Sequence, residues 1–333
     1  VDCNINATVN VNRLRIVNGY ASTITQGAFD ITIGAGSFQM SSGVFSGSGN
    51  SVTVTGNFQQ DGGVFTSTSG TLNIGGFALN GGTFNTNNGT FQSTSFNQSD
   101  GVFNGSASPI TISGPFSQNG GTFNNTSNTL VATTLEIFGG VFDGSSGSIT
   151  LGTSFSQTGG SFTSTSGTLQ VTSSASTVFA TTNGTFIHNS GTVRVQGSST
   201  PAVSTTGLNR LYHLTFTTPT TVGGTLYVDG NLNVGTVNNY ASGTTIFLKG
   251  DCTGTINNSN TGTFSIVGTG DQNFSINRLP TTVINKPSGT LIFGNSIIAG
   301  TGWTHTKGAI NWNGFSCTFP STGSFTTITS GNF

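Results

Sequence analysis

The sequence predicts an all-β protein: a right-handed parallel β-solenoid with coils of 19 or 20 residues, three short strands in each coil and stacked phenylalanine ladders. Two observations carry this prediction, namely a phrase that recurs in one register and a composition that suits strands and turns. Only 5% of the residues are charged, whereas Gly occurs 51 times and Phe 27 times. Such a composition disfavours helices, and it disfavours disorder, which goes with high charge and few aromatic residues.

The recurring phrase is Phe-x-Gln-x-Gly-Gly-x-Phe, as at residues 58–65 and 116–123. Its first position is Phe in all coils but one, where Leu135 replaces it, and a second Phe follows seven residues later. Because no coil can bury these rings alone, stacking of successive coils must bury them. The predicted ladder residues are Phe38, Phe45, Phe58, Phe65, Phe77, Phe84, Phe96, Phe103, Phe116, Phe123, Phe142, Phe155, Phe162, Phe179 and Phe186.

A third strand follows the second Phe of each coil, and its apolar residues lie two apart, as in Val52 and Val54. Residues two apart in a strand point to the same face, here the interior. Between the two Phe of each coil, one position is always glycine. A turn that needs a positive φ explains this restriction. The predicted turn glycines are Gly43, Gly63, Gly82, Gly101, Gly121, Gly140, Gly160 and Gly184.

Three segments are predicted from the regularity of the repeat. Residues 1–37 form an N-terminal strand segment and a first degenerate coil, and residues 38–200 form the regular coils. The register loosens in residues 201–333, although pairs of alternating apolar residues and Gly-containing turns continue. We expect an irregular continuation of the same solenoid there, and the alternative is a separate β-sandwich.

Charge and cysteine usage limit the partners. No Lys or Arg lies between Arg15 and Arg194, so a nucleic-acid partner is not expected, because phosphate binding needs clustered cations. No apolar run is long enough for a membrane span. Cys3, Cys252 and Cys317 are too widely spaced for a zinc site. Two interpretations stay open for the cysteines: small buried residues, or a Cys252–Cys317 disulfide that leaves Cys3 over.

The residue after the second Phe is Asn85, Asn104, Asn124 and Asp143 in four successive coils. One interpretation is a column of side chains that hydrogen-bond along the axis, as in cross-β ladders. The other is glycosylation, since Asn-x-Ser/Thr triplets occur repeatedly. The candidate glycosylation sites are Asn88, Asn104, Asn124 and Asn183.

The phrase, together with the stretches at residues 268–274 and 284–291, resembles the β-strand-repeat proteins secreted by Bacteroidetes and related bacteria. The resemblance implies a parallel β-solenoid, export and a cell-surface, adhesive or fibrous role. It carries no catalytic residues. Glycosidases and lyases built on β-helices need neighbouring carboxylates, and this spacing is missing here, so no enzyme activity, cofactor or metal is expected.

The expected function is therefore that of an extracellular structural protein whose solenoids stack end to end into a surface fibre or matrix. Both ends of the sequence alternate like strands, at residues 9–16 and 325–333, and an exposed strand edge pairs with another chain unless it is blocked. The expected partner is thus a second copy of the chain, with carbohydrate as a further candidate. The alternative is a monomeric adhesin, or an ice-binding or carbohydrate-binding solenoid module of a longer surface protein.

Overall fold

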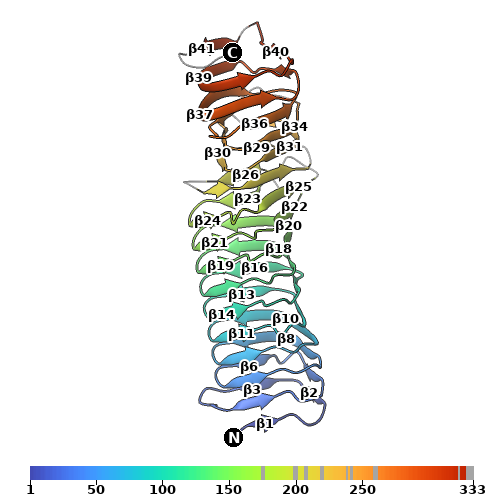
Figure 1. Ribbon diagram of the computed structural model, residues 1–333. Coiled ribbons are helices and arrows are strands. Elements are labelled where there is room, and N and C mark those ends of the chain that lie inside the picture. The colour runs from blue at the N-terminus through green and yellow to red at the C-terminus, as the bar shows by residue number, and fades with distance from the viewer. Residues whose placement is uncertain are drawn as a thin grey trace. The chain divides into compact units, whose positions relative to one another are not determined.

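The computed structural model describes residues 1–173, 177–197, 202–205, 209–217, 221–237, 239–240, 243–257, 262–321 and 323–327. These residues form parallel strands stacked as a β-solenoid of about 15 turns, with buried phenylalanine ladders, so the predicted fold class is confirmed (Figure 1). The chain divides into two compact units. Unit 1 comprises residues 1–169 and 183–186, and unit 2 comprises residues 170–182 and 187–333.

One sheet of unit 1 holds the second Phe of each coil. Its strands pair in parallel along the stack, with each Phe directly opposite the next, as Phe84 is opposite both Phe65 and Phe103. Its strands, in order, are β1 (Cys3–Asn4), β4 (Thr23–Thr25), β7 (Val44–Ser46), β9 (Val64–Thr66), β11 (Thr83–Asn85), β14 (Val102–Asn104), β17 (Thr122–Asn124), β19 (Val141–Asp143), β21 (Ser161–Thr163) and β24 (Thr185–Ile187).

The remaining strands of unit 1 carry the third strand of one coil and the first strand of the next. In β8, β10, β18 and β20 the two run on as one bent strand, with a register shift at the bend of β10 and of β18. These strands are β2 (Val9–Val11), β3 (Leu14–Ile16), β5 (Ile31–Ile33), β6 (Phe38–Met40), β8 (Val52–Gln60), β10 (Thr71–Leu79), β12 (Thr90–Ser93), β13 (Phe96–Gln98), β15 (Ile110–Ile112), β16 (Pro115–Gln118), β18 (Leu130–Ile137) and β20 (Ile149–Gln157).

Unit 2 has less regular coils, although they are not generally longer than those of unit 1. Its described pairings are all parallel, such as β30 with β33 and β34 with β36, whereas a β-sandwich is built from antiparallel sheets. The chain passes between the units in β22 (Thr168–Thr172) and β24. The further strands are β23 (Thr177–Thr181), β25 (Thr192–Gln196), β26 (Ala202–Thr205), β27 (Arg210–Leu211), β28 (His213–Phe216), β29 (Thr221–Val222), β30 (Thr225–Val228), β31 (Leu232–Val237), β32 (Asn239–Tyr240), β33 (Thr245–Leu248), β34 (Cys252–Ile256), β35 (Thr263–Ile266), β36 (Gln272–Ile276), β37 (Thr281–Phe293), β38 (Ile297–Ile298), β39 (Gly302–Asn311), β40 (Cys317–Thr318) and β41 (Ser324–Thr327).

The fifteen predicted ladder phenylalanines are all buried, and none is more than 5% exposed. In the second ladder, rings on adjacent coils are nearly parallel, with centroids 4.6 Å apart between Phe103 and Phe123 and 5.6 Å apart between Phe162 and Phe186. The phenylalanines of the first ladder also lie opposite each other on successive coils, but many of their rings are tilted and not parallel. Phe38 and Phe58 stack, but the rings of Phe77 and Phe96 meet at 65°.

The tilt in the first ladder has a local cause, because one third-strand position holds a phenylalanine, Phe91, where most coils have an aliphatic residue. Its ring meets Phe77 and Phe96 edge-on, at 5.7 Å and 6.3 Å. Edge-to-face pairs are as favourable as offset stacks, because the positive ring edge approaches the negative face. At this coil a third aromatic ring, Phe91, therefore packs against the two ladders.

The eight turn glycines have φ between 63° and 85°, as their fixed place in the repeat predicted. A Cβ on Gly82 would also lie 2.3 Å from the carbonyl oxygen of Gly63 in the coil before. The coils approach each other through backbone at this turn. Only glycine meets both conditions, the left-handed backbone and the missing side chain.

Replacing Gly82 by valine is therefore expected to lower the free energy of unfolding by about 2 kcal/mol or more, because a β-branched residue is strained at positive φ. Gly81→Asn is the matched comparison. A Cβ there would also lie close to backbone, 2.6 Å from Asp61 O, but other coils carry Asp100 and Asn183 at this position. Urea unfolding of both variants checks the prediction, and equal losses would contradict it.

The glutamine of the recurring phrase has a role that its position in the sequence did not reveal. Gln98 is completely buried, and its Nε2 donates to Gly101 O of its own turn at 3.1 Å and to Thr122 O of the next coil at 3.0 Å. It thereby joins two coils from the inside. Its buried counterparts Gln60, Gln118 and Gln157 donate in the same way, each to the turn glycine of its own coil and to the first residue of the second strand in the next coil.

Candidate functional site

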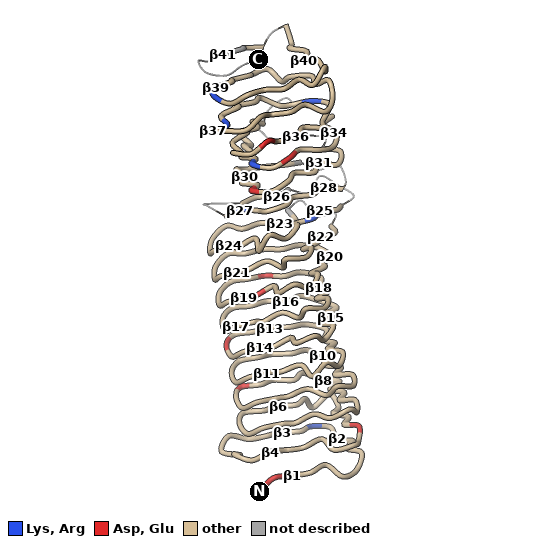
Figure 2. Tube along the Cα trace, in the orientation of Figure 1, with Lys and Arg blue, Asp and Glu red and all other residues tan. Residues whose placement is uncertain are grey.

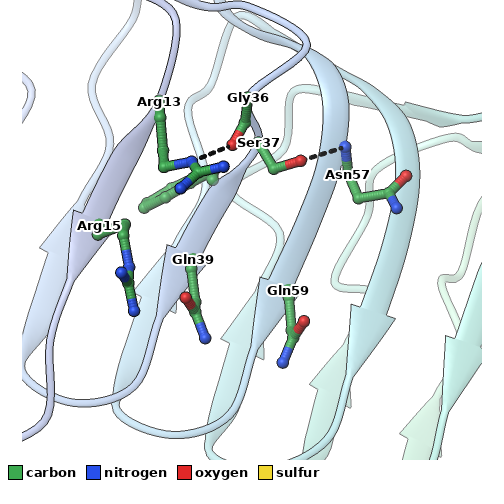
Figure 3. Close-up of a pocket in the computed structure, with 8 residues that line it drawn as sticks. Arg13, Arg15, Gly36, Ser37, Gln39, Asn57 and Gln59 are labelled. Atoms are coloured by element: carbon green, nitrogen blue, oxygen red, sulfur yellow. Dashed lines mark hydrogen bonds between the residues drawn. The ribbon is translucent and has the colours of Figure 1, made fainter.

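An outward hollow of about 310 Å³ lies over the first coils of unit 1, where third strands bend into first strands (Figure 3). Its floor includes the buried Phe38 and the backbone of Gly36. Three of the polar side chains around it lie on β3, β6 and β8, and the others lie just before β3, just before β6 and at the bend of β8. The polar side chains are Arg13, Arg15, Ser37, Gln39, Asn57 and Gln59.

A second hollow of about 140 Å³ continues the first along the stack, since Asn57 lines both. Its other lining residues lie on β10 and β13 and on the corner between β12 and β13, among them Ala78, Asn97 and Ser95. We call the two together the N-terminal groove. It crosses β3, β6, β8, β10 and β13, so the groove runs across the strands and along the stack.

Parallel register aligns the side chains of the groove. Arg15 pairs with Gln39 and Gln39 with Gln59, so these three outward side chains form one column. Arg13 Nε donates to Gly36 O at 2.7 Å, and Ser37 Oγ accepts the N–H of Asn57 at 3.2 Å (Figure 3). Both arginines are exposed. The groove therefore presents two guanidinium groups at one end and amides and hydroxyls along its length.

One carboxylate lies beside this column. Asp61 accepts hydrogen bonds from Gln59 at 2.8 Å, Asn80 at 2.9 Å and Gln39 at 3.2 Å. Burial raises the pKa of Asp61, but these side-chain hydrogen bonds outweigh burial and hold the pKa below its ordinary value. The carboxylate thus orients the amides of the groove and stays ionised at neutral pH.

Unit 2 has its own outward cluster. Asp229 binds both Arg210, at 2.9 Å, and Lys249, at 2.8 Å. Burial raises the pKa of Asp229, but the two cations outweigh it and lower the pKa. Arg210 also lies over the ring of Tyr227, at 4.9 Å, and Tyr227 stacks on Phe247 at 4.8 Å. The sequence indicated only a turn at Asp229, although Arg210 precedes it by 19 residues and Lys249 follows it by 20, spacings that match the length of a coil.

The column of asparagines is a hydrogen-bonded ladder, as one of the two interpretations expected. Asn104 Nδ2 donates to Asn85 Oδ1 at 2.7 Å, and Asn124 Nδ2 donates to Asn104 Oδ1 at 2.8 Å. The ladder ends at Asp143, whose Oδ1 accepts the N–H of Ser145 in its own turn. Among the four candidate glycosylation sites, Asn88 and Asn183 are exposed, whereas Asn104 and Asn124 are half-buried in this ladder. Glycosylation stays a prediction.

The two stretches that carried the resemblance meet in unit 2 through Lys286. This side chain is completely buried, and its Nζ donates to Gly268 O, Gly270 O and Gln272 Oε1 at 3.1, 2.8 and 2.5 Å. Burial lowers the pKa of Lys286, and Asp271 opposes this effect. The ammonium group therefore ties the turn of one coil to the strand of the next, which the sequence did not predict.

The three cysteines are free, so the Cys252–Cys317 disulfide that the sequence left open is not formed. Cys252 is buried on β34 and pairs with Phe274, whereas Cys317 pairs with Ile297 in another coil. Burial raises the pKa of both thiols, to about 11 for Cys317. Cys3 is exposed on β1. Within the described part of the chain, no three His, Cys, Asp or Glu side chains lie together as a metal ion would require.

Across the described residues, no helix has the length and apolar character to cross a membrane.

Comparison with known proteins gives no relative of the chain. No protein-family model, curated protein or solved structure matches the chain. The relation to secreted β-strand-repeat proteins therefore stays a prediction from the quoted residues.

Proposed function

We propose that this protein is an extracellular structural subunit that assembles end to end through its terminal strands. The observation that carries the proposal is the one-sided pairing of the first strands. Among the described strands, β1, β2 and β3 pair only with β4, β5 and β6. The extracellular location rests on the composition and on the resemblance to secreted proteins.

The unpaired edge can be assigned residue by residue. In β2, Val9 N donates to Asp30 O at 3.1 Å, and Val11 O accepts from Gly34 N at 2.8 Å. Because the backbone groups of successive residues in a parallel strand point to opposite edges, the N–H and C=O of Asn10 point away from β5. Strand addition by another chain would satisfy them, since it needs only main-chain hydrogen bonds.

The other end of the chain offers a complementary edge. In the described residues, β41 pairs with β39 and β40 pairs with β38, each through one edge. The segment proposed as the docking partner is residues 325–333, of which 328–333 lie outside the described residues. A contact between unlike ends repeats without closing and so produces a filament.

Asn10→Pro is expected to abolish filaments seen by electron microscopy while leaving the subunit folded. Proline removes the N–H on the open edge, and edge strands tolerate this change. Asn10→Ala keeps that N–H and serves as the matched control. Val9→Pro instead removes the hydrogen bond from Val9 N to Asp30 O that joins β2 to the next coil, and it is expected to lower stability.

Deletion of residues 1–16 is the stronger form of the same test, because it removes β1, β2 and β3 together. Filaments of unchanged axial repeat from either the deletion or Asn10→Pro would rule out this joint. Short discrete rods from the unaltered chain would favour the alternative, a monomeric surface-binding module.

A further inference from the structure

We propose that the N-terminal groove is a binding site for an acidic polysaccharide, a polyhydroxylated linear chain that carries carboxylate or sulfate groups. The proposal does not depend on end-to-end assembly. It rests on three features of the groove: its two arginines without an ion-pair partner among the described residues, its polar lining and its direction along the stack.

The charge of the groove stands out because the rest of unit 1 has no other Lys or Arg. Figure 2 shows how sparse the charged residues are along this unit. The two ion pairs of the described residues both belong to Asp229 in unit 2, so neither Arg13 nor Arg15 is paired with a carboxylate in them. Arg13 Nε is engaged by Gly36 O, and Arg15 stands exposed beside it. Guanidinium groups bind carboxylate and sulfate oxygens through paired hydrogen bonds.

The remaining lining suits sugar hydroxyls. Gln39 and Gln59 offer their amide oxygens, because their amide nitrogens bind Asp61. Asn97 offers its amide nitrogen, Asn57 offers a donor and an acceptor, and Ser95 adds a hydroxyl. A sugar hydroxyl both donates and accepts, so it can pair with each of these groups. The hydrogen bonds from Gln39 and Gln59 to Asp61 hold both amides in place, and preorganised groups lose less entropy on binding.

The groove is long enough for several sugar units. It crosses five strands, β3, β6, β8, β10 and β13, and neighbouring strands lie about 4.8 Å apart. Four such spacings give a length of roughly 19 Å. A linear polymer laid along the stack would meet the arginines at one end and the amides of successive coils after them.

Two other linear polymers fit less well. A nucleic acid presents a phosphate at every nucleotide and needs cations along its length, whereas only the end of this groove is positive. Single-stranded bases also need aromatic faces to stack on, and Phe38 and Phe77 in the floor are at most 2% exposed. A peptide would require a free strand edge, but the strands of the floor are paired on both sides from β6 to β13.

Binding of the full-length chain to polygalacturonate and to dextran sulfate, with neutral dextran as the uncharged reference, tests the site. Calorimetry or sedimentation at low and high salt gives the affinity. We expect both acidic polymers to bind, neutral dextran to bind much more weakly, and affinity to fall as salt screens the arginines. Arg15→Gln should weaken binding roughly tenfold or more, as loss of a charged hydrogen bond does. Arg13→Gln/Arg15→Gln should abolish it.

Lys307→Gln is the matched control, because it removes one exposed positive charge from unit 2, and its affinity should stay within about twofold of the unaltered chain. Asn57→Trp tests whether binding needs the open groove as well as the positive charge of the arginines. Asn57 is exposed at the point where the two hollows meet, so a bulky ring there should weaken polymer binding while both arginines stay in place.

Three results would overturn the proposal. These are no binding of either acidic polymer, equal binding by Arg13→Gln/Arg15→Gln and the unaltered chain, or binding of single-stranded DNA as tight as that of the acidic polysaccharides. Thermal unfolding of each variant confirms that the fold is kept. Filament formation is scored separately by microscopy, so failure of the binding site and failure of the proposed assembly are distinguishable.

Discussion

Replacing Phe103 by alanine is expected to lower the free energy of unfolding by about 3–5 kcal/mol. Phe103 is completely buried, and its ring stacks between Phe84, at 5.1 Å and 4°, and Phe123, at 4.6 Å and 8°. Truncation would remove both stacked contacts and the edge contacts with Phe91 and Phe96. The stack cannot close such a gap easily, because its neighbours are held in place by strand pairing on both sides.

Phe138→Ala is the matched control for this prediction. Phe138 lies in the same unit and undergoes the same substitution, but its side chain is 48% exposed. We expect a loss of about 0.5 kcal/mol or less there, as for surface changes in general. Urea unfolding followed by circular dichroism measures both variants. Losses of similar size would contradict the assignment of the ladder as the core of the fold.

Replacing Gln98 by glutamate is expected to destabilise the protein in a pH-dependent way. The two acceptors around Gln98 Nε2 are carbonyl oxygens, Gly101 O and Thr122 O. A carboxylate there would face both and be buried without a cation, so the folded protein would keep the group protonated. Its folded pKa would lie above the unfolded value of about 4.3. The unfolded chain therefore releases the proton first, and stability is lost as the pH rises above that value.

The slope of this loss is about 1.4 kcal/mol per pH unit between the unfolded and the folded pKa. At pH 7 the cost should therefore reach roughly 3–4 kcal/mol, while near pH 4 most of it should disappear. Urea unfolding at pH 4, 5.5 and 7 measures the effect. The control is Gln92→Glu, at an exposed position of β12, where stability should change little with pH.

A third variant separates the hydrogen bonds of Gln98 from its volume. Leu79 occupies the equivalent position in the preceding coil, where it is completely buried. Gln98→Leu should accordingly cost only about 1–2 kcal/mol, from the two carbonyls that lose a donor. Two results would contradict the proposed role of Gln98 in joining two coils. One is a loss of stability for Gln98→Glu that does not depend on pH, and the other is a loss for Gln98→Leu as large as that for Gln98→Glu at pH 7.

The repeat alone was enough to predict the solenoid, its coil length and which residues stack. This is because identical coils stacked in parallel place equivalent positions opposite each other, so position in the repeat determines position in the structure. The positive φ at Gly82 and its counterparts followed from the same reasoning, since only one residue type satisfies that turn. Neither result required knowledge of how the coils bend.

The features that depend on the bend could not be read from the repeat. Arg15, Gln39 and Asn57 look like unrelated polar residues in the sequence, and the corner between third and first strands makes them one groove. The direction of Gln98 is likewise set by the turn carbonyl of Gly101 and by the carbonyl of Thr122 in β17 of the next coil, which both face its amide. The sequence by itself determined the stacking, because that is a matter of period. Tertiary structure alone decided which side chains meet across a corner, because this depends on backbone angles that the repeat does not encode.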